Sequence, residues 1–343
     1  MLTRRWFVGG ALAALATPRL ARAQRRAIVD GAGRRVEIPS GVRRVFAAGG
    51  PASIFIYTLA PEMLLGWTRP PTAEERRWLP ARYADLPALG RLTGRGNTAN
   101  VEVVLAARPD VIVDFGTIGP TYASLADRVQ EQTKVPYVLL DGSLAATARA
   151  YTVAGDLLGV PQRAGELARY VEQTLSDVDR RVAGVPRERR PRVYYARGPR
   201  GLETAAPGSI NAESLDRLGA RNVAAGSGRG LTTVSLEQVI AWDPDVIMTL
   251  DTAFFASVTR DPTWRSVRAV SEGRVYLVPL LPFPWMDAPP SVNRVIGLRW
   301  LGHVLYPDVF PDTLRDEARS FYRLFYHRAP DERQLDSLLG AKP

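Results

Sequence analysis

The sequence has 343 residues, no cysteine and only two histidines. Without cysteine the chain has no disulfides, thiolate metal sites or thiol nucleophiles, so packing alone has to stabilise it. A hydrophobic content of 46% is ample for that. Protein sites for zinc, manganese or nickel favour clusters of imidazole and carboxylate groups. Because His303 and His327 lie in a predicted C-terminal helical region, we expect surface or packing roles for them, no metal site and no resident cofactor.

Long apolar runs are also missing, because no stretch after the leader approaches the ~18 apolar residues that a membrane span requires. The leader, residues 1–24, has Arg4 and Arg5 before an apolar run over residues 6–16, and a small-residue stretch at 21–23. This pattern predicts a signal peptide. Residues 3–7, Thr-Arg-Arg-Trp-Phe, resemble a twin-arginine export signal, with an ordinary secretory signal as the alternative. We therefore expect a periplasmic protein exported by the twin-arginine route.

Catalytic motifs are a third absence, since the chain has no Gly-x-Ser-x-Gly elbow and no His-Glu-x-x-His sequence. The glycine-rich segment 226–230 lacks the lysine and the following helix of a phosphate loop. We therefore do not expect an enzyme. The net charge of +10 comes from arginines spread along the chain without a nucleic-acid-binding motif, so it predicts no nucleic-acid partner. Such a charge favours anionic ligands or an anionic membrane surface.

An internal repeat is the most informative feature that is present. Residues 100–113 match residues 235–248 at an offset of 135 residues. Each copy has the pattern of a capping residue, a short helix with one apolar face, a Pro-Asp turn and a buried strand. The offset is too long for a solenoid period, so the repeated αβ unit predicts two similar α/β lobes.

Further patterns fit this plan. Short apolar runs predict strands at 44–48, 64–67 and 137–140 in the first half and at 192–196 and 275–278 in the second. A helical stretch starts at 141–143, breaks near 159–161 and resumes over 162–182 with apolar residues at threes and fours. At about 1.5 Å per residue its second part spans roughly 30 Å, which suits a strut between lobes. Amphipathic patterns at 292–304 and 313–325 predict helices that pack on the second lobe.

The expected fold class is therefore α/β, with two Rossmann-like α/β lobes joined by a single long α-helix. The expected boundaries are a signal peptide at 1–24, an N-terminal α/β lobe at 25–143, an interlobe helical linker at 144–187, and a C-terminal α/β lobe with C-terminal helices at 188–343.

A set of short segments occurs in a recognisable order. These are residues 43–46 as the first strand, the Gly90-Arg91 turn before 100–102, Pro-Asp-Val-Ile at 109 and 244, and segments 208–213 and 219–223. Together they make about residues 26–310 resemble the cobalamin and iron-siderophore periplasmic binding proteins of ABC importers. The resemblance implies the helical-backbone, two-lobed fold and delivery of a bound ligand to a membrane permease.

The resemblance also implies residue roles. In this family a glutamate on the outer tip of each lobe contacts permease arginines, and Glu213 falls at the second-lobe position. Ile54 stands at the first-lobe position, which leaves Glu62 as the nearby substitute. The family also places a ligand-binding arginine at the turn that contains Arg91.

Ligands of open α/β sheets collect beyond the carboxyl ends of the strands, which in a two-lobed protein means the interlobe cleft. The loops expected there mix arginine with aromatic side chains. Guanidinium groups pair with carboxylates or oxyanions, and aromatic faces cover apolar ligand surface. An anionic chelate that brings its own metal ligation matches both. The candidate ligand-binding residues are Ser53, Arg91, Asn97, Phe115, Tyr195, Arg197, Arg229, Phe254 and Trp285.

The predicted function is an extracytoplasmic solute-binding protein of an ABC importer that binds an anionic metal chelate. A ferric siderophore is the first expectation, with a corrinoid or haem next. A molybdate-like oxyanion fits the same arginine-bearing cleft, and a ligand-sensing receptor module is an alternative of another class. The expected partners are the ABC permease, its ATPase and the chelate, with the chain itself a monomer.

Overall fold

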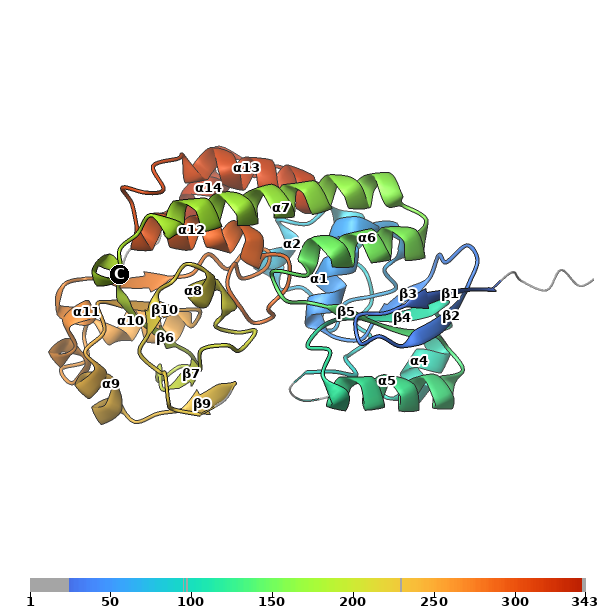
Figure 1. The fold of residues 1–343 in the computed structure, drawn as a ribbon, viewed down its shortest axis with the longest axis horizontal. Coiled ribbons are helices and arrows are strands. Elements are labelled where there is room, and N and C mark those ends of the chain that lie inside the picture. The colour runs from blue at the N-terminus through green and yellow to red at the C-terminus, as the bar shows by residue number, and fades with distance from the viewer. Residues whose placement is uncertain (1–24, 95, 97, 229, 341–343) are drawn as a thin grey trace, which may run out of the picture.

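The computed structural model describes residues 25–340 except 95, 97 and 229, so the predicted signal peptide at 1–24 lies outside the described part. Two α/β lobes, each built on a parallel sheet, lie on either side of the molecule, and one long helix runs past both (Figure 1). The predicted fold class is confirmed. Within the described ranges, no helix is long and apolar enough to cross a membrane.

The first lobe has a parallel sheet in the order β3-β4-β5, preceded by the antiparallel hairpin β1-β2. In the central strand, residues 111–115 are all buried, as expected where helices cover both faces of a parallel sheet. Figure 1 shows α4 and α5 on one side of this sheet and α1 and α6 on the other. The elements are β1 Arg25–Val29, β2 Arg35–Pro39, β3 Val45–Ala47, α1 Gly50–Leu59, η1 Pro61–Met63, α2 Ala73–Arg76, α3 Ala81–Ala84, α4 Val101–Ala107, β4 Val111–Gly116, α5 Pro120–Thr133 and β5 Tyr137–Asp141.

The second lobe has a parallel sheet in the order β11-β10-β6-β8 and a small antiparallel pair, β7-β9. Its strands β6 and β10 are also almost wholly buried. The elements are η2 Arg187–Arg189, β6 Arg192–Ala196, β7 Glu203–Ala205, α8 Glu213–Arg217, β8 Arg221–Asn222, β9 Leu231–Thr233, α9 Leu236–Trp242, β10 Val246–Thr249, α10 Thr252–Val258, η3 Trp264–Ser266, α11 Arg268–Ser271 and β11 Val275–Leu277.

The sequence repeat is a structural repeat. Asn100 and Ser235 cap α4 and α9 by accepting a hydrogen bond from the backbone N–H three residues on. Both helices end in a left-handed residue, Arg108 with φ 47° and Asp243 with φ 39°. The chain then turns into β4 and β10, the central strands of the two sheets.

The Pro-Asp turns fix how each repeat joins its neighbouring strand. Oδ2 of Asp110 accepts hydrogen bonds from the backbone N–H groups of Arg43 and Arg44, at 2.8 and 2.9 Å. Oδ2 of Asp245 accepts in the same way from the N–H of Arg192 at 2.7 Å. Each aspartate therefore anchors the strand beside its own, β3 in the first lobe and β6 in the second.

The lobes are connected by α6 Thr147–Leu158 and the long helix α7 Pro161–Ala183. Gly159 ends α6 with φ 71°, and Pro161 occupies the first turn of α7, where a missing N–H costs nothing. The buried face of α7 contains every residue of the predicted apolar stripe. Figure 1 shows α7 spanning the molecule from the first lobe to the second. The boundaries at 143 and 187 stay predictions.

The C-terminal helices are α12 Arg294–Leu305, α13 Leu314–Phe325 and α14 Glu332–Leu339. They share one apolar core with α1, α7 and strands of both lobes. Tyr57 of α1 donates a hydrogen bond from its hydroxyl to the Tyr326 carbonyl at 2.8 Å, and the two rings lie 6.4 Å apart. The C-terminal helices therefore pack on the first lobe as well, which the sequence did not predict.

Two local predictions differ from the structure. The expected strand at 64–67 forms only isolated bridges, Val45 with Leu64 and Trp67 with Ala88. Its two ends pair with different segments, so no continuous ladder develops. The helical stretch expected from 141 begins later, because α6 starts at Thr147 after a turn.

Candidate functional site

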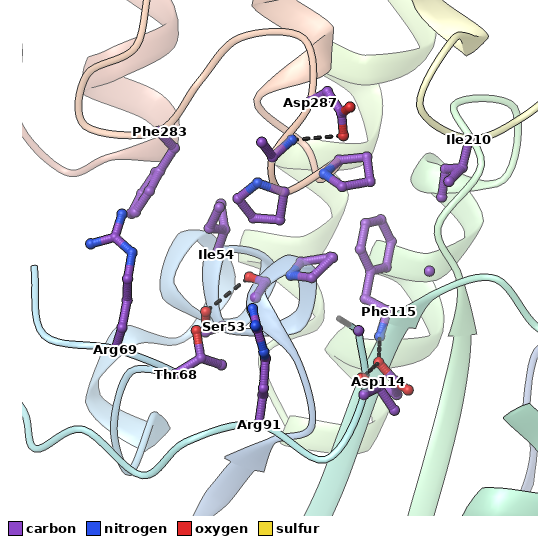
Figure 2. A pocket seen from close by; sticks show the side chains of 18 of the residues that line it. Ser53, Ile54, Thr68, Arg69, Arg91, Asp114, Phe115, Ile210, Phe283 and Asp287 are labelled. Carbon is purple, nitrogen blue, oxygen red and sulfur yellow. Dashed lines mark hydrogen bonds between the residues drawn. The ribbon is translucent and has the colours of Figure 1, made fainter. Parts of the chain in front are cut away.

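A cavity of about 800 Å³ lies between the lobes, beside the carboxyl ends of β3, β4 and β6. It is bounded by the turn that begins α1, by the loops at 67–71 and 91–98, and by segments 210–211 and 283–290. This is where open parallel sheets place their ligands. Figure 2 shows side chains from both lobes converging on this cleft.

The start of α1 forms one corner of the cleft. Its N-cap is Gly49, which offers no side-chain acceptor; Pro51 has no N–H and the Ser53 N–H is bonded to the Gly49 carbonyl, so the N–H groups of Gly50 and Ala52 are the uncapped donors of the first turn. The Ser53 hydroxyl lies beside them and donates to the Gly50 carbonyl at 2.9 Å. A Cβ on Gly49 would lie 2.6 Å from the Thr93 hydroxyl, which explains why a glycine stands there. Helix N-termini of this kind favour anions.

Arg91 points at the same corner from the loop below (Figure 2). Its Nε donates to the Gly96 carbonyl at 3.0 Å, and its own carbonyl accepts from the N–H groups of Thr98 and Ala99. Gly90 makes this turn feasible, since it has φ 75° and a Cβ there would lie 2.8 Å from the Thr98 backbone. Across the described ranges, no carboxylate pairs with the Arg91 guanidinium. Arg91 is therefore an uncompensated cation in the cleft.

The second-lobe wall is neutralised internally. Arg197 follows β6 and pairs with Asp287 and with Oε1 of Glu203, the latter at 2.9 Å. Asp287, fully buried, also accepts hydrogen bonds from the Tyr195 hydroxyl at 3.0 Å and the Asn211 amide at 2.8 Å. Burial raises the pKa of Tyr195, so it stays a neutral donor. Two carboxylates on one guanidinium leave no free positive charge among the described residues of this wall.

The floor of the cleft holds a buried carboxylate, Asp114, at the end of β4. Its oxygens accept hydrogen bonds from the Phe115 N–H at 3.0 Å, the Tyr137 hydroxyl at 3.2 Å and the Thr93 hydroxyl at 3.3 Å. Burial raises the pKa of Asp114 to about 6, and these three hydrogen bonds oppose the rise only in part.

The opposite rim combines an ion pair with aromatic surface. Arg69 pairs with Glu75, whose Oε2 lies 2.7 Å from Nη1 of Arg69. Phe283 packs against Trp67 at a centroid distance of 5.7 Å and against Tyr57 at 6.0 Å. Figure 2 shows Phe283 and Arg69 together on this side of the cleft. This rim offers apolar contact more than charge.

The structure distributes the nine predicted ligand-binding residues unevenly. Four line the cleft: Ser53, Arg91, Phe115 and Arg197. Three do not line it: Tyr195, which stands behind Arg197, and Phe254 and Trp285, which are buried in the hydrophobic core. Asn97 and Arg229 lie outside the described residues.

The core positions of the two aromatic residues have local causes. The Phe254 ring meets Trp264 edge to face with centroids 4.9 Å apart and covers Gly201. The Trp285 indole N–H donates to the Tyr322 hydroxyl at 3.1 Å, and its carbonyl lies against Gly297 of α12. Both rings therefore gain more from packing than a position in the open cleft would give them.

Several lining residues have no counterpart among the predicted ones. They are Thr68, Arg69, Thr93, Asp114, Asn211 and Asp287. The sequence could have indicated Asp114 as a site residue, because it is the only charged residue in the apolar run 111–115. For the others only tertiary structure identifies the side chains that face the cleft.

The two predicted docking glutamates have different surroundings. Glu62 is exposed on the first lobe in η1. Glu213 begins α8, and its Oε2 lies 2.6 Å from Nη1 of the fully buried Arg294. Its Oε1 accepts from the N–H of Leu144, which lies between β5 and α6, at 2.8 Å. Both oxygens of Glu213 therefore have partners inside the molecule.

The sequence and the fold were compared with those of known proteins. Residues 73–280, more than half of the chain, match the family model described as Periplasmic binding protein. The chain belongs to the periplasmic binding protein family. Such substrate-binding proteins work with the permease and ATPase of an ABC importer and are not enzymes. The predicted family is thus confirmed, and its members are periplasmic.

Individual relatives cover most of the chain. The Molybdate-binding protein MolA of Haemophilus influenzae is 25% identical over 325 residues, covering 88% of this chain and 91% of that protein. An ABC transporter solute binding protein from Sulfurospirillum deleyianum is 30% identical with a TM-score of 0.84, covering 92% and 99% of the two chains. A periplasmic heme binding protein from Pseudomonas aeruginosa is 26% identical with a TM-score of 0.60, covering 78% and 93%.

The cleft shows how this family member can hold a ligand. Across the described ranges, no group of three or more His, Cys, Asp or Glu side chains is placed to hold a metal ion. The polar groups that face the cavity are hydroxyls, amides and arginines, along with carboxylates that are already hydrogen-bonded. Such groups bind a solute through its oxygen atoms.

Proposed function

We propose that this chain is the solute-binding protein of an ABC importer for an anionic metal chelate, with a ferric siderophore first and a corrinoid or haem next. The observation that carries the proposal is the uncompensated Arg91 beside the start of α1 and Ser53. The anionic oxygens of the ligand would bind at this corner, where the Arg91 guanidinium and the N–H groups of Gly50 and Ala52 are donors.

The size of the cavity supports a chelate. An oxyanion with four oxygens occupies on the order of 100 Å³ if each oxygen takes roughly the 30 Å³ of a water molecule. The cavity of about 800 Å³ is several times larger and lies within the usual range for organic ligands. Ile54, Phe115 and Phe283 line the remaining space and would cover the apolar body of a chelate.

A molybdate-like oxyanion is the second candidate. It is favoured by the relative named Molybdate-binding protein MolA, which is 25% identical over most of both chains. The corner formed by Arg91, Ser53 and the start of α1 would suffice for such an ion. Closure of the lobes would then have to remove most of the cavity volume.

Native mass spectrometry with elemental analysis of the protein purified from its own periplasm would identify a retained ligand. Calorimetry with ferric citrate, a ferric hydroxamate, haem, cyanocobalamin and sodium molybdate would rank the classes, and quenching of Trp67, which lines the cleft, would give a second readout. Tightest binding of a ferric chelate supports the proposal, and binding of molybdate alone favours the second candidate. No binding of any compound would refute both.

Arg91→Ala tests the corner directly. We expect affinity for the bound anion to fall by about ten- to a hundredfold, since charge-assisted hydrogen bonds are worth roughly 1.5–3 kcal/mol. The matched control is Arg128→Ala, an exposed arginine of α5 in the same lobe. Unchanged affinity in the Arg91 variant would remove it from the site.

The export route and the state of the mature protein are also part of the proposal. We propose export through the twin-arginine route, a monomeric protein without a resident cofactor, and a ligand that carries its own metal. Blocking twin-arginine export in the native host should leave the precursor in the cytoplasm. Continued appearance of the mature protein in the periplasm would indicate the ordinary secretory route.

A further inference from the structure

Asp114 is a buried carboxylate that the proposed ligand does not need. It is 6% exposed, yet it lines the cleft floor beside Phe115 (Figure 2). Each of its three hydrogen bonds comes from a neutral donor of the first lobe: the Phe115 N–H, the Tyr137 hydroxyl and the Thr93 hydroxyl. The Asp114 carboxylate thus has no cation partner and lies in the wall of a site for anions. An anionic ligand that binds near it meets electrostatic repulsion, which lowers the binding affinity.

The charged surroundings of Asp114 are sparse. From β5, Tyr137 faces it, and burial raises the pKa of that tyrosine well above its usual value, so it stays neutral. Arg34 contacts the far side of this strand through the Tyr137 carbonyl. The 91–98 loop contributes Thr93 and, across the cleft corner, Arg91. Among the described residues, no arginine or lysine forms an ion pair with Asp114.

We propose that Asp114 couples ligand capture to protonation, so that an anion entering the cleft is accompanied by proton uptake on this carboxyl. The proposal rests on the anionic ligand proposed above. Protonation removes the repulsion and turns an oxygen of Asp114 into a donor. The new O–H can face the Tyr137 hydroxyl, which is able to accept, or an oxygen of the ligand.

The direction of the effect follows from linkage. Because the free carboxyl has a pKa of about 6, it is mostly charged above that pH, and a bound anion raises the pKa further. Affinity is therefore highest when the carboxyl is already protonated and falls as pH rises through the two pKa values. A rise of one unit on binding corresponds to about a tenfold loss of affinity between pH 5 and pH 8.

Asp114→Asn is a conservative test. The asparagine oxygen can still accept from the Phe115 N–H and the Thr93 hydroxyl, and its amide can donate to the Tyr137 hydroxyl oxygen. The variant therefore keeps the local hydrogen bonds and loses only the titration. Asp156→Asn, at an exposed carboxylate of α6, makes the same charge change away from the cleft.

The experiment is calorimetry between pH 5.5 and 8 in two buffers of different ionisation enthalpy, with the tightest binder among ferric citrate, haem and sodium molybdate. With a pKa rise of one unit on binding, wild type and Asp156→Asn should take up about half a proton per ligand near pH 6.5 and lose roughly sevenfold in affinity over this range. Asp114→Asn should take up none and bind equally at all pH values. Titration of the ligand itself is common to all three proteins and cancels in the comparison.

The outcomes separate the two proposals. Binding with the same pH profile in wild type and Asp114→Asn would refute the role of Asp114 and leave the proposed function intact. Binding without proton uptake in wild type would do the same. Failure of every compound to bind at every pH would refute the anionic ligand and the proton coupling with it.

Discussion

The ion pair between Glu213 and Arg294 makes a specific prediction about stability. Arg294 begins α12, is fully buried, and donates to the carbonyls of Ser291 at 3.1 Å, Ile210 at 3.2 Å and Gly142. Among the described residues its carboxylate partner is Glu213, at 2.6 Å. Burial lowers the pKa of Arg294 and the Glu213 charge opposes this. The pair thus joins α12 to segments of both lobes.

We expect Glu213→Ala to lower the free energy of unfolding by about 3 kcal/mol. Removing one partner of a buried pair costs roughly 3–5 kcal/mol, because the remaining charge is left uncompensated. The lower end applies here, since the Glu213 side chain is 25% exposed and Arg294 keeps its carbonyl acceptors. Urea unfolding followed by circular dichroism measures the change.

Two further variants make the test specific. Glu172→Ala, at an exposed glutamate of α7, should change stability by less than about 0.5 kcal/mol. In a double-mutant cycle with Arg294→Met, the second substitution should recover part of the loss, with a coupling energy of at least about 1.5 kcal/mol. A loss below about 1 kcal/mol in Glu213→Ala, or additive effects in the cycle, would show that the pair does not clamp the lobes.

This prediction changes how the docking role proposed for Glu213 has to be tested. A drop in uptake by Glu213→Ala is expected from lost stability alone, so it does not identify a permease contact. Docking has to be measured as binding of the folded protein to the permease in membranes, with stability matched between variants. Normal permease binding by such a variant would leave Glu213 with the interlobe role only.

Two other predictions address the exposed glutamate and the buried tryptophan. Glu62→Ala should leave stability and ligand affinity unchanged, because its side chain is exposed, and should weaken binding to the permease; unchanged uptake in cells would rule out the contact. Trp285→Ala should cost about 3–5 kcal/mol in urea unfolding, because it empties a fully buried site. Loss of ligand affinity without loss of stability would place Trp285 at the ligand instead of in the core.

The repeat was predictable because its signals are local. The caps at Asn100 and Ser235 and the aspartates of the two Pro-Asp turns act within a few residues or on the next strand, and their spacing survives in the sequence. The segment 64–67 has the same apolar character as a strand. It failed to form one because its ends pair with two different segments, which no local pattern encodes.

The cleft was predictable as a set of loops and much less as a set of side chains. Arg91 could be inferred because the family resemblance places a ligand-binding arginine at the Gly90-Arg91 turn, and the structure gives Gly90 the positive φ of such a turn. Trp285 and Arg197 occupy similar loops, yet one is core and the other is held by two carboxylates. Asp287, which forms a buried ion pair with Arg197, stands 90 residues further along the chain. Such long-range partners determine which candidates remain available to a ligand.

These partners make the two walls of the cleft unequal. An anion at the second-lobe wall would meet a guanidinium already neutralised by Asp287 and Glu203. At the first-lobe wall it would meet Arg91 and the start of α1, where no described carboxylate forms an ion pair with Arg91 and Asp114 can be protonated. We therefore infer that the ligand binds first to the N-terminal lobe, and that Asn211 and the hydrogen-bonded network around Asp287 contact it as the cleft closes. Arg91 then makes the main favourable electrostatic contribution to ligand binding. Arg197→Ala should therefore weaken binding less than Arg91→Ala does.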